Sequence, residues 1–255
     1  MEVDFNFFAL TVDIDWAPDV AIDYLADKLL NNNIKATWFV THWSDSIERL
    51  SRHPEIFELG WHPNFLPNSS HGKTEREVLQ FMQKMLPDSK SSRSHCLVQT
   101  SPILKMMVNE FDIEIESSML LRESHHLMPH EMFFDDRAKK LLRIPFCWED
   151  DVEMHNPAKS WDFNNLKYHF QGLKVWNFHP MYIYLNADTM DNYEKLKRIK
   201  PLFELSGEEI EKFRNKGQGS DTVLNGFIKY IKEKQLSSHT LSEIAGIWRE
   251  NNFEN

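Results

Sequence analysis

The chain has 255 residues, and its 29 Lys and Arg against 39 Asp and Glu give a formal net charge of −10 and a pI near 5.6. Proteins that bind nucleic acid need a basic surface to neutralise phosphates, and this sequence has no Lys/Arg cluster, so DNA and RNA are not expected partners. Hydrophobic residues make up 41% of the chain, which is enough for a large core and excludes a disordered protein. With 8 Gly and 11 Pro there is no linker-like stretch, and we expect a single domain over residues 1–255. The 12 histidines beside a surplus of carboxylates hint at a bound metal ion.

The cysteines and the N-terminus bear on the cellular compartment. Cys96 and Cys147 cannot form a disulfide framework and stand in no CxxC pattern, which favours a reducing compartment. The acids Glu2 and Asp4 lie where a signal peptide would carry positive charge. No window approaches the roughly 18 consecutive apolar residues that a membrane helix needs. We therefore expect a cytoplasmic protein with no integral membrane segment.

The chain alternates between strand-like and helix-like segments. Phe7 to Val12 is a continuous apolar run, which is typical of a strand buried on both faces. Pro18 then opens a helical pattern, because proline suits the first helical turn. Thr74 and Glu77 form a capping-box pattern that predicts another helix start. We predict further strands at 34–40, 56–61, 91–98, 113–117, 141–148 and 173–178, and helices at 45–52, 74–85, 101–111, 222–234 and 241–251.

This alternation indicates an α/β protein built from βα units around a parallel sheet. About seven strands without a linker favour a closed or nearly closed β/α barrel over an open doubly wound sheet. No GxGxxG or GxxxxGK(S/T) pattern follows the first strand, which argues against the open-sheet nucleotide binders. In a β/α barrel the loops after the carboxyl ends of the strands build the active site, so chemistry is expected just past each apolar run.

The first strand ends in two carboxylates, Asp13 and Asp15. Side chains in a strand repeat every two residues, so both can project from one side of the strand end. Two close carboxylates repel each other unless a cation separates them. The alternative is a solvated acidic turn in which Asp15 caps the helix that begins near Pro18.

Histidines follow two other predicted strands. His62 comes directly after the third strand and His71 lies in the loop beyond it; with a carboxylate they would form a common ligand set for a divalent ion with open positions. His179 ends the strand at 173–178, where a barrel presents a catalytic acid or base. Each of these could instead be an ordinary hydrogen-bonded histidine. Arg93 and the acids Glu149, Asp150 and Asp151 end two more predicted strands, and we expect no ligand among the histidines of residues 124–130.

Six short segments, taken in chain order, resemble the NodB-like polysaccharide deacetylases of carbohydrate esterase family 4. They are Thr-Val-Asp-Ile-Asp, Ala-Thr-Trp-Phe-Val, Glu-Leu-Gly-Trp-His, Arg-Ser-His, Trp-Glu-Asp-Asp and Asn-Phe-His-Pro, and they lie within residues 7–180. The resemblance implies a deformed (β/α)7 barrel and a hydrolase that uses one divalent metal ion to remove acetyl groups from N-acetyl sugars. Zinc is the metal expected from it, with iron, manganese, cobalt and nickel as alternatives.

The resemblance also implies roles for individual residues. Asp13 matches the catalytic base, Arg93 the arginine beside that base, and His179 the general acid, which Asp150 is chosen to orient over Glu149 and Asp151. Asp15 and His62 match metal ligands. The family's second metal histidine, four residues after His62, is Leu66 here. We propose His71 in its place, with Asn64 as a poorer substitute.

The expected partner is an N-acetylated carbohydrate, such as a surface polysaccharide or its precursor. We place Asn64, His95, Trp148 and Trp176 in the substrate site, although core packing explains such tryptophans equally well. One rival interpretation is hydrolysis of a non-sugar amide, as in allantoinase-like relatives of the fold. A second is a degenerate protein that binds glycan without turnover, which the missing histidine at Leu66 motivates. The sequence does not indicate the oligomeric state.

Overall fold

A computed structural model describes residues 5–134, 139–166 and 171–252. The first four residues, on which the signal-peptide argument partly rests, therefore lie outside the described residues. Within the described residues the strands belong to one sheet of ten. Their bounds are β1 Phe8–Asp13, β2 Ala36–Val40, β3 Phe57–Trp61, β4 Ser91–Ser92, β5 Ile115–Glu116, β6 His130–Phe133, β7 Lys140–Arg143, β8 Trp148–Glu149, β9 Lys174–Phe178 and β10 Ser238–His239.

The sheet is parallel except at one edge, and its order is β6-β7-β5-β4-β3-β2-β1-β9-β8. β6 runs antiparallel to β7, and β10 pairs in parallel with the start of β1. The chain after β5 also meets the chain before β8, because Phe146 N–H donates to Met119 O at 3.0 Å and Leu121 N–H donates to Phe146 O at 2.9 Å. These bonds draw the two sides of the sheet together, and the curled sheet confirms the predicted β/α barrel.

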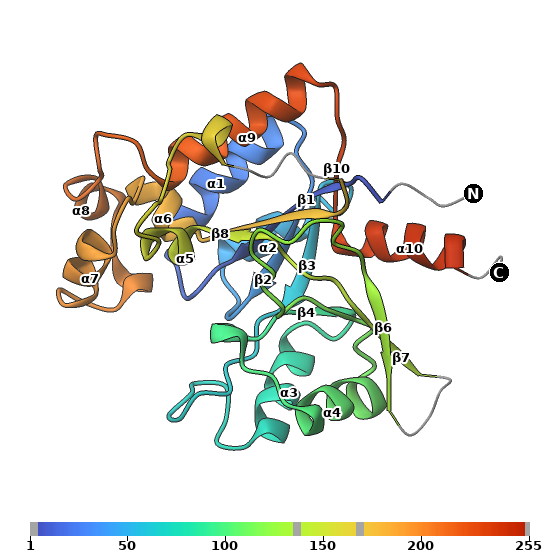
Figure 1. The fold of residues 1–255 in the computed structure, drawn as a ribbon. Coiled ribbons are helices and arrows are strands. Elements are labelled where there is room, and N and C mark those ends of the chain that lie inside the picture. The colour runs from blue at the N-terminus through green and yellow to red at the C-terminus, as the bar shows by residue number, and fades with distance from the viewer. Residues whose placement is uncertain (1–4, 135–138, 167–170, 253–255) are drawn as a thin grey trace.

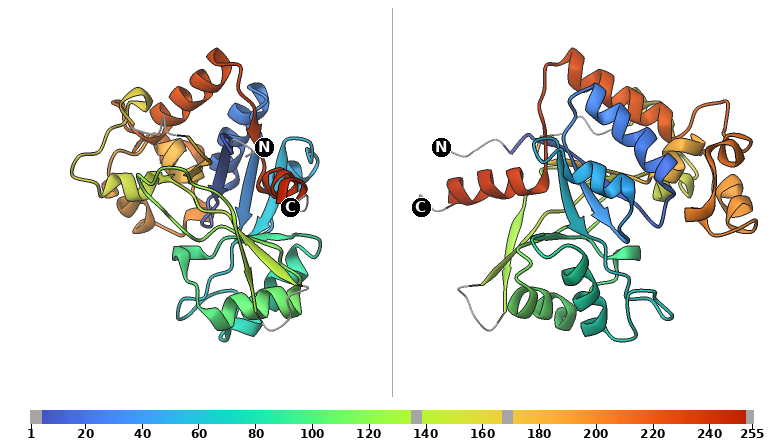
Figure 2. Two further views of the ribbon diagram at one scale, coloured as in Figure 1. Left: turned by 45° about the vertical axis from the view of Figure 1, so that its right-hand side comes forward. Right: turned by 180° about the vertical axis from the view of Figure 1, so that it is seen from behind.

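The helices lie outside the sheet (Figure 1). α1 and α9 run side by side over one side of it, while α3 and α4 pack together below it in this view (Figures 1 and 2). An ion pair between Lys28 of α1 and Asp221 of α9, 2.5 Å long, ties the first two together. The α-helices are α1 Asp19–Asn31, α2 Asp45–Ser51, α3 Glu75–Met85, α4 Ser101–Phe111, α5 Asp150–Met154, α6 Pro180–Leu185, α7 Asp191–Lys197, α8 Gly207–Glu211, α9 Ser220–Glu233 and α10 Leu241–Asn252.

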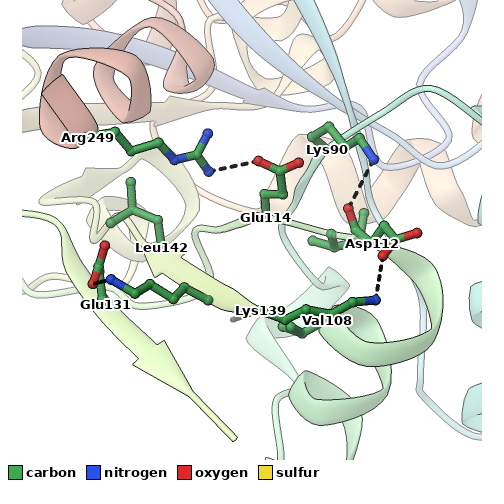
Figure 3. A pocket seen from close by; sticks show the side chains of 10 residues that line it. Lys90, Val108, Asp112, Glu114, Glu131, Lys139, Leu142 and Arg249 are labelled. Carbon is green, nitrogen blue, oxygen red and sulfur yellow. Dashed lines mark hydrogen bonds and ion pairs between the residues drawn. The ribbon is translucent and has the colours of Figure 1, made fainter. Parts of the chain in front are cut away.

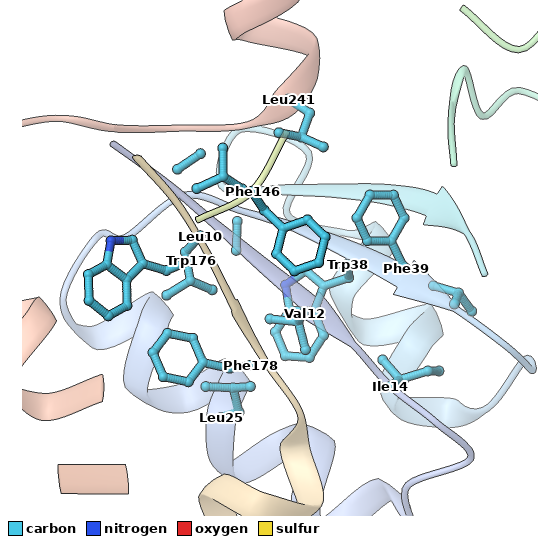
Figure 4. Close-up of a cluster of buried hydrophobic side chains, with 14 of the residues drawn as sticks. Leu10, Val12, Ile14, Leu25, Trp38, Phe39, Phe146, Trp176, Phe178 and Leu241 are labelled. Carbon is cyan, nitrogen blue, oxygen red and sulfur yellow. The ribbon is translucent and has the colours of Figure 1, made fainter. Parts of the chain in front are cut away.

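Strand β1 supplies both the core and the site, because its alternate side chains face opposite ways. Leu10 and Val12 are fully buried among other apolar side chains, including Leu25 of α1 (Figure 4). Thr11 and Asp13, on the opposite face, are also buried but meet polar groups. One face of β1 thus packs against the helical layer, and the other face places polar side chains inside the barrel.

Most predicted elements match the structure, and the capping box at Thr74 and Glu77 forms as expected. The strand predicted at 91–98 is an exception, since only Ser91 and Ser92 are extended in the sheet. Cys96 and Leu97 have φ values of 53° and 54°, which turn the chain into a short 3-10 helix, His95–Leu97. The strand predicted at 141–148 is divided into β7 and β8. The sequence patterns do not predict β6, β10 or the helices α5 to α8.

None of the helices in the described part of the chain is both long and apolar enough to cross a membrane.

Candidate active site

Polar residues from five strands meet at the carboxyl end of the barrel. Asp13 ends β1, His62 follows β3, Arg93 follows β4, Asp150 follows β8 and His179 follows β9. Because these strands are parallel, their carboxyl ends lie at the same edge of the sheet.

Asp15 lies at the centre of one group of ligand-type side chains. Its Oδ1 is 3.1 Å from His62 Nε2 and 2.9 Å from His95 Nδ1. Asp15 and Trp16 have φ values of 42° and 54°, so the chain reverses directly after β1 and holds the carboxylate over the strand ends. The ligand atoms of this group all lie within 4.8 Å of one another.

The hydrogen bonds of His62 show that this group needs a cation. His62 Nδ1 is 2.7 Å from the carbonyl oxygen of Arg93, which can only accept, so Nδ1 carries the hydrogen. In the neutral ring, Nε2 then presents a lone pair to an Asp15 oxygen. Two acceptors face each other, and a proton or a metal ion between them resolves the conflict. One carboxylate and two imidazoles, one of them fixed by a main-chain carbonyl, fit a divalent metal ion.

The charges in this group stabilise one another. Burial raises the pKa of Asp15, but the hydrogen bonds with His62 and His95 outweigh burial and hold that pKa well below its ordinary value. Burial likewise lowers the pKa of His95, and its hydrogen bond and charge interaction with Asp15 raise it to about 10. The carboxylate is therefore ionised and available as a ligand.

Asp13 sits in a buried network beneath this group. Arg93, which is completely buried, donates through Nη1 to Asp13 Oδ1 at 3.1 Å. Asn177 donates through Nδ2 to Asp13 Oδ2 at 3.1 Å. Arg93 is itself held by the main-chain oxygen of Ser117 at 2.8 Å and by the hydroxyl of Ser117 at 2.9 Å. A guanidinium fixed in this way keeps Asp13 in one orientation.

Asn177 is the hub of that network. Its Nδ2 also donates to Glu149 Oε1 at 2.8 Å, and its Oδ1 accepts from Thr11 Oγ1 at 2.9 Å and from Arg93 Nη1. Sequence reasoning missed this residue. A signal was available, because Asn177 and His179 stand two positions apart at the end of one strand and so face the same side.

His179 is paired with Asp150. Its Nδ1 lies 2.7 Å from Asp150 Oδ1, its main-chain N–H donates to Asp150 Oδ2 at 3.0 Å, and Ser220 Oγ donates to that oxygen at 2.8 Å. Burial lowers the pKa of His179, but the charge and hydrogen bond of Asp150 outweigh it and raise that pKa well above its ordinary value. His179 Nε2 points back to the centre, 3.7 Å from Asp15 Oδ2.

The other two acids near Asp150 take different positions. Glu149 contacts Asn177, and burial followed by repulsion from Asp151 raises the pKa of Glu149 well above its ordinary value. Burial also raises the pKa of Asp151. Of the three acids, the structure brings Asp150 to His179.

The structure does not bring His71 to Asp15. His71 Nδ1 accepts from the main-chain N–H of Asn64 at 3.1 Å, and Nε2 lies 2.9 Å from the carbonyl oxygen of Thr41. Both ring nitrogens are therefore occupied by the main chain, and burial lowers the pKa of His71 to about 4. The side chain of Asn64 is also used locally, as its Oδ1 accepts from Leu66 N–H at 3.0 Å. His95, which we had placed in the substrate site, takes the position that we had expected for His71.

Two tryptophans proposed for the substrate site are core residues. Trp148 and Trp176 are each 1% exposed and contact each other, with ring centroids 5.1 Å apart. Trp148 of β8 and Trp176 of β9 are paired neighbours in the sheet, and this packing buries both. Trp16 is the tryptophan at the site, since its ring meets that of His95 edge-on at 5.2 Å.

A hollow of about 560 Å³ lies at the opposite, amino-terminal end of β4, β5 and β7 (Figure 3). Three of its four cations are paired with acids: Arg249 with Glu114 at 2.8 Å, Lys139 with Asp112 at 2.8 Å, and Lys140 with Glu131 at 2.6 Å. The fourth, Lys90, donates to the main-chain oxygen of Asp112 at 3.4 Å. This hollow is separate from the polar cluster.

Known proteins resemble this chain in sequence and fold. The family model described as WbmS-like polysaccharide deacetylase matches residues 10–197. A crystal structure from Bordetella bronchiseptica, described as that of a candidate polysaccharide deacetylase involved in O-antigen biosynthesis, is 30% identical with a TM-score of 0.78 and covers 89% of this chain and 91% of that one. A family 4 acetyl xylan esterase from Clostridium thermocellum in complex with a cobalt ion is 16% identical, with a TM-score of 0.47 and coverage of 94% and 91%. No curated protein sequence matches the chain significantly.

Proposed function

The chain belongs to the WbmS-like polysaccharide deacetylase family, and we propose that it is a metal-dependent hydrolase that removes an acetyl group from an N-acetyl sugar. The observation that carries this proposal is the group of Asp15, His62 and His95, which lies between an arginine-held carboxylate and an aspartate-held histidine.

Asp15, His62 and His95 would hold one divalent metal ion, with zinc expected from the resemblance. Such an ion, when bound, lowers the pKa of a coordinated water and polarises a carbonyl oxygen. His95 replaces His71 in this assignment, because Nδ1 of His95 faces the same oxygen of Asp15 as Nε2 of His62. The hydrogen bond of His62 to the carbonyl of Arg93 fixes the tautomer that binds a metal.

Asp13 is the general base in this proposal. Its carboxylate accepts hydrogen bonds from Arg93 and Asn177, and its Oδ2 lies 4.0 Å from His62 Nε2, so it borders the ligand group without joining it. From that position Asp13 would take a proton from the attacking water. Arg93 holds the orientation of this carboxylate during the step.

His179 is the general acid. Asp150 holds its Nδ1, so Nε2 remains free to donate a proton to the departing amine. A proton must reach the nitrogen as the C–N bond breaks, because the nitrogen would otherwise have to leave as an amide anion, which is a very poor leaving group. The Asp150 carboxylate stabilises the imidazolium, as an orienting acid does in other catalytic pairs.

The substrate class is inferred from the family and from the similar protein of Bordetella bronchiseptica. The Bordetella protein is described as involved in O-antigen biosynthesis, which supports an N-acetyl sugar of a surface polysaccharide or its precursor as the substrate here.

The test is acetate release by the purified protein from a panel of N-acetyl oligosaccharides and sugar nucleotides, with cyclic amides as the comparison. We expect release from sugars that a chelator abolishes and added divalent metal restores. Asp13→Asn should remove turnover while the metal content stays at one ion per chain. A protein that binds no metal and releases no acetate, or that hydrolyses only cyclic amides, would contradict the proposal.

A further inference from the structure

A groove of about 570 Å³ lies next to the polar cluster. Residues 16–20 after β1 form one wall and residues 42–44 after β2 form the second. Phe203 and residues 205–207, before and at the start of α8, form the third. Trp16 belongs to both places: it follows Asp15 in the chain, its ring contacts that of His95 at 5.2 Å, and it lines the groove. The groove therefore borders the candidate active site, with Trp16 between them.

Two aromatic side chains stand open to solvent in this groove. Trp43 is 47% exposed and Phe203 is 58% exposed, and they come from different walls. Most of the large apolar side chains in the described part of the chain are buried, so two exposed rings facing one groove are an informative exception. Flat apolar rings with a few polar groups beside them are typical of a ligand site.

The side chains around the groove offer no cationic partner to an anionic ligand. Among the residues that the structure places around it, the ionisable ones are Asp19 and His42, and none is Lys or Arg. Burial lowers the pKa of His42, so this ring adds no cation at neutral pH. The diphosphate of a sugar nucleotide needs cationic partners, which this groove lacks. The cations that line the hollow in Figure 3 lie at the other end of the barrel.

The third wall also lies beyond the part of the chain that the family model matches, which ends at residue 197. Phe203 therefore belongs to a segment that can distinguish this protein from other members.

We propose that the groove binds the uncharged sugar unit next to the N-acetyl sugar at the active site, with Trp43 and Phe203 as its specificity-determining residues. This inference rests on the proposed function. It makes the substrate an oligosaccharide or a longer glycan, and not a single sugar on a nucleotide.

The experiment compares two probes, the tetrasaccharide of N-acetylglucosamine and the methyl glycoside of the single sugar. Wild type, Trp43→Ala and Phe203→Ala are assayed for acetate release and for binding by calorimetry, with UDP-N-acetylglucosamine as a third ligand. Phe133→Ala is the matched control, because Phe133 is an aromatic residue of β6 that is 48% exposed and does not line the groove. We expect each groove variant to lose about 2- to 12-fold in kcat/KM and in affinity for the tetrasaccharide, from the usual worth of an aromatic contact. The methyl glycoside should be unaffected, and the control should match wild type with both probes.

Several results would overturn the inference. One is that the groove variants have the same kcat/KM and affinity for the tetrasaccharide as wild type. Another is that the variants lose equally with the tetrasaccharide and the methyl glycoside. A third is that the wild-type protein binds the sugar nucleotide or the methyl glycoside as tightly as the tetrasaccharide. Binding separates this inference from the proposed function. If no probe releases acetate but the variants still weaken tetrasaccharide binding, the catalytic proposal fails and the subsite stands.

Discussion

Replacing Asn177 by Leu tests whether the buried network beneath the site is held by this one amide. Leu has nearly the same volume but cannot hydrogen bond, so four contacts disappear at once: those with Asp13, Glu149, Thr11 and Arg93. Thr11 and Arg93 keep other acceptors, since Thr11 Oγ1 lies 3.3 Å from Trp176 O and Arg93 still bonds to Ser117. The cost therefore falls on Asp13 and Glu149.

The size of that cost follows from what each carboxyl retains. The carboxyl of Glu149 has no other hydrogen bond within the described part of the chain. Leaving a buried polar group without a hydrogen-bond partner costs about 1–3 kcal/mol. Asp13 loses one of two hydrogen bonds to an ionised group, worth about 1.5–3 kcal/mol. The variant should lose about 2.5–6 kcal/mol of the free energy of unfolding, out of roughly 5–15 kcal/mol for a typical domain. Activity should fall by about 10- to 100-fold because Asp13 loses its second anchor.

The assay is urea unfolding at neutral pH, followed by circular dichroism, with acetate release measured on the folded fraction. Asn192→Leu is the matched control: Asn192 is half-buried in α7, donates one hydrogen bond to Phe213 O at 2.8 Å and accepts one from Lys195 Nζ at 3.2 Å. We expect the control to lose about 1 kcal/mol and to keep its activity. If Asn177→Leu unfolds no more easily than the control and keeps wild-type turnover, Asn177 does not organise the site.

Three further predictions concern ligands, protons and packing. His95→Ala should lose its metal ion by elemental analysis, whereas His71→Ala should keep it because both ring nitrogens of His71 contact the main chain; the opposite pattern would return His71 to the ligand set. The pKa of Glu149 is raised in the folded protein. Above the ordinary pKa of 4.5 the unfolded chain therefore releases a proton that the folded chain retains. For this reason Glu149 lowers the free energy of unfolding increasingly as the pH rises. Glu149→Gln should therefore be more stable than wild type at pH 7 by urea unfolding, with the difference shrinking toward pH 4; a difference independent of pH would show that Glu149 is ionised in the folded protein. Gly219→Ala should lower the melting temperature strongly, because a Cβ there would lie 2.1 Å from the main-chain oxygen of Asn186, and an unchanged melting temperature would mean that this close approach is absent.

The sequence predicted those site residues whose positions depend on a strand. Asp13, His62 and His179 directly end or follow buried apolar runs, so the parallel sheet alone brings them together. The choice between His71 and His95 depends on loop conformation. The left-handed turn at Cys96 and Leu97 keeps His95 beside Asp15, and no periodicity in the sequence indicates such a turn.

Tryptophans show the complementary difficulty. Trp148, Trp176 and Trp16 all adjoin motifs, and the sequence gives no reason to separate them. Burial separates them in the structure, because β8 pairs with β9 and covers the first two. Burial is a property of the packed barrel as a whole, which explains why the fold was easier to predict than the substrate surface.

The hydrogen bond from Ser220 to Asp150 has a consequence for the order in which the protein matures during synthesis. Asp150 and His179 emerge from the ribosome well before Ser220, which begins α9. Strands β1 to β9 precede α9 in the chain, so the residues that carry the acid and its partner are synthesised before the hydroxyl that supports them. The second oxygen of Asp150 nevertheless lacks its hydroxyl donor until α9 docks against α1. A nascent chain thus contains β1 to β9 first, and it gains a fully supported proton donor only after α9 has been synthesised.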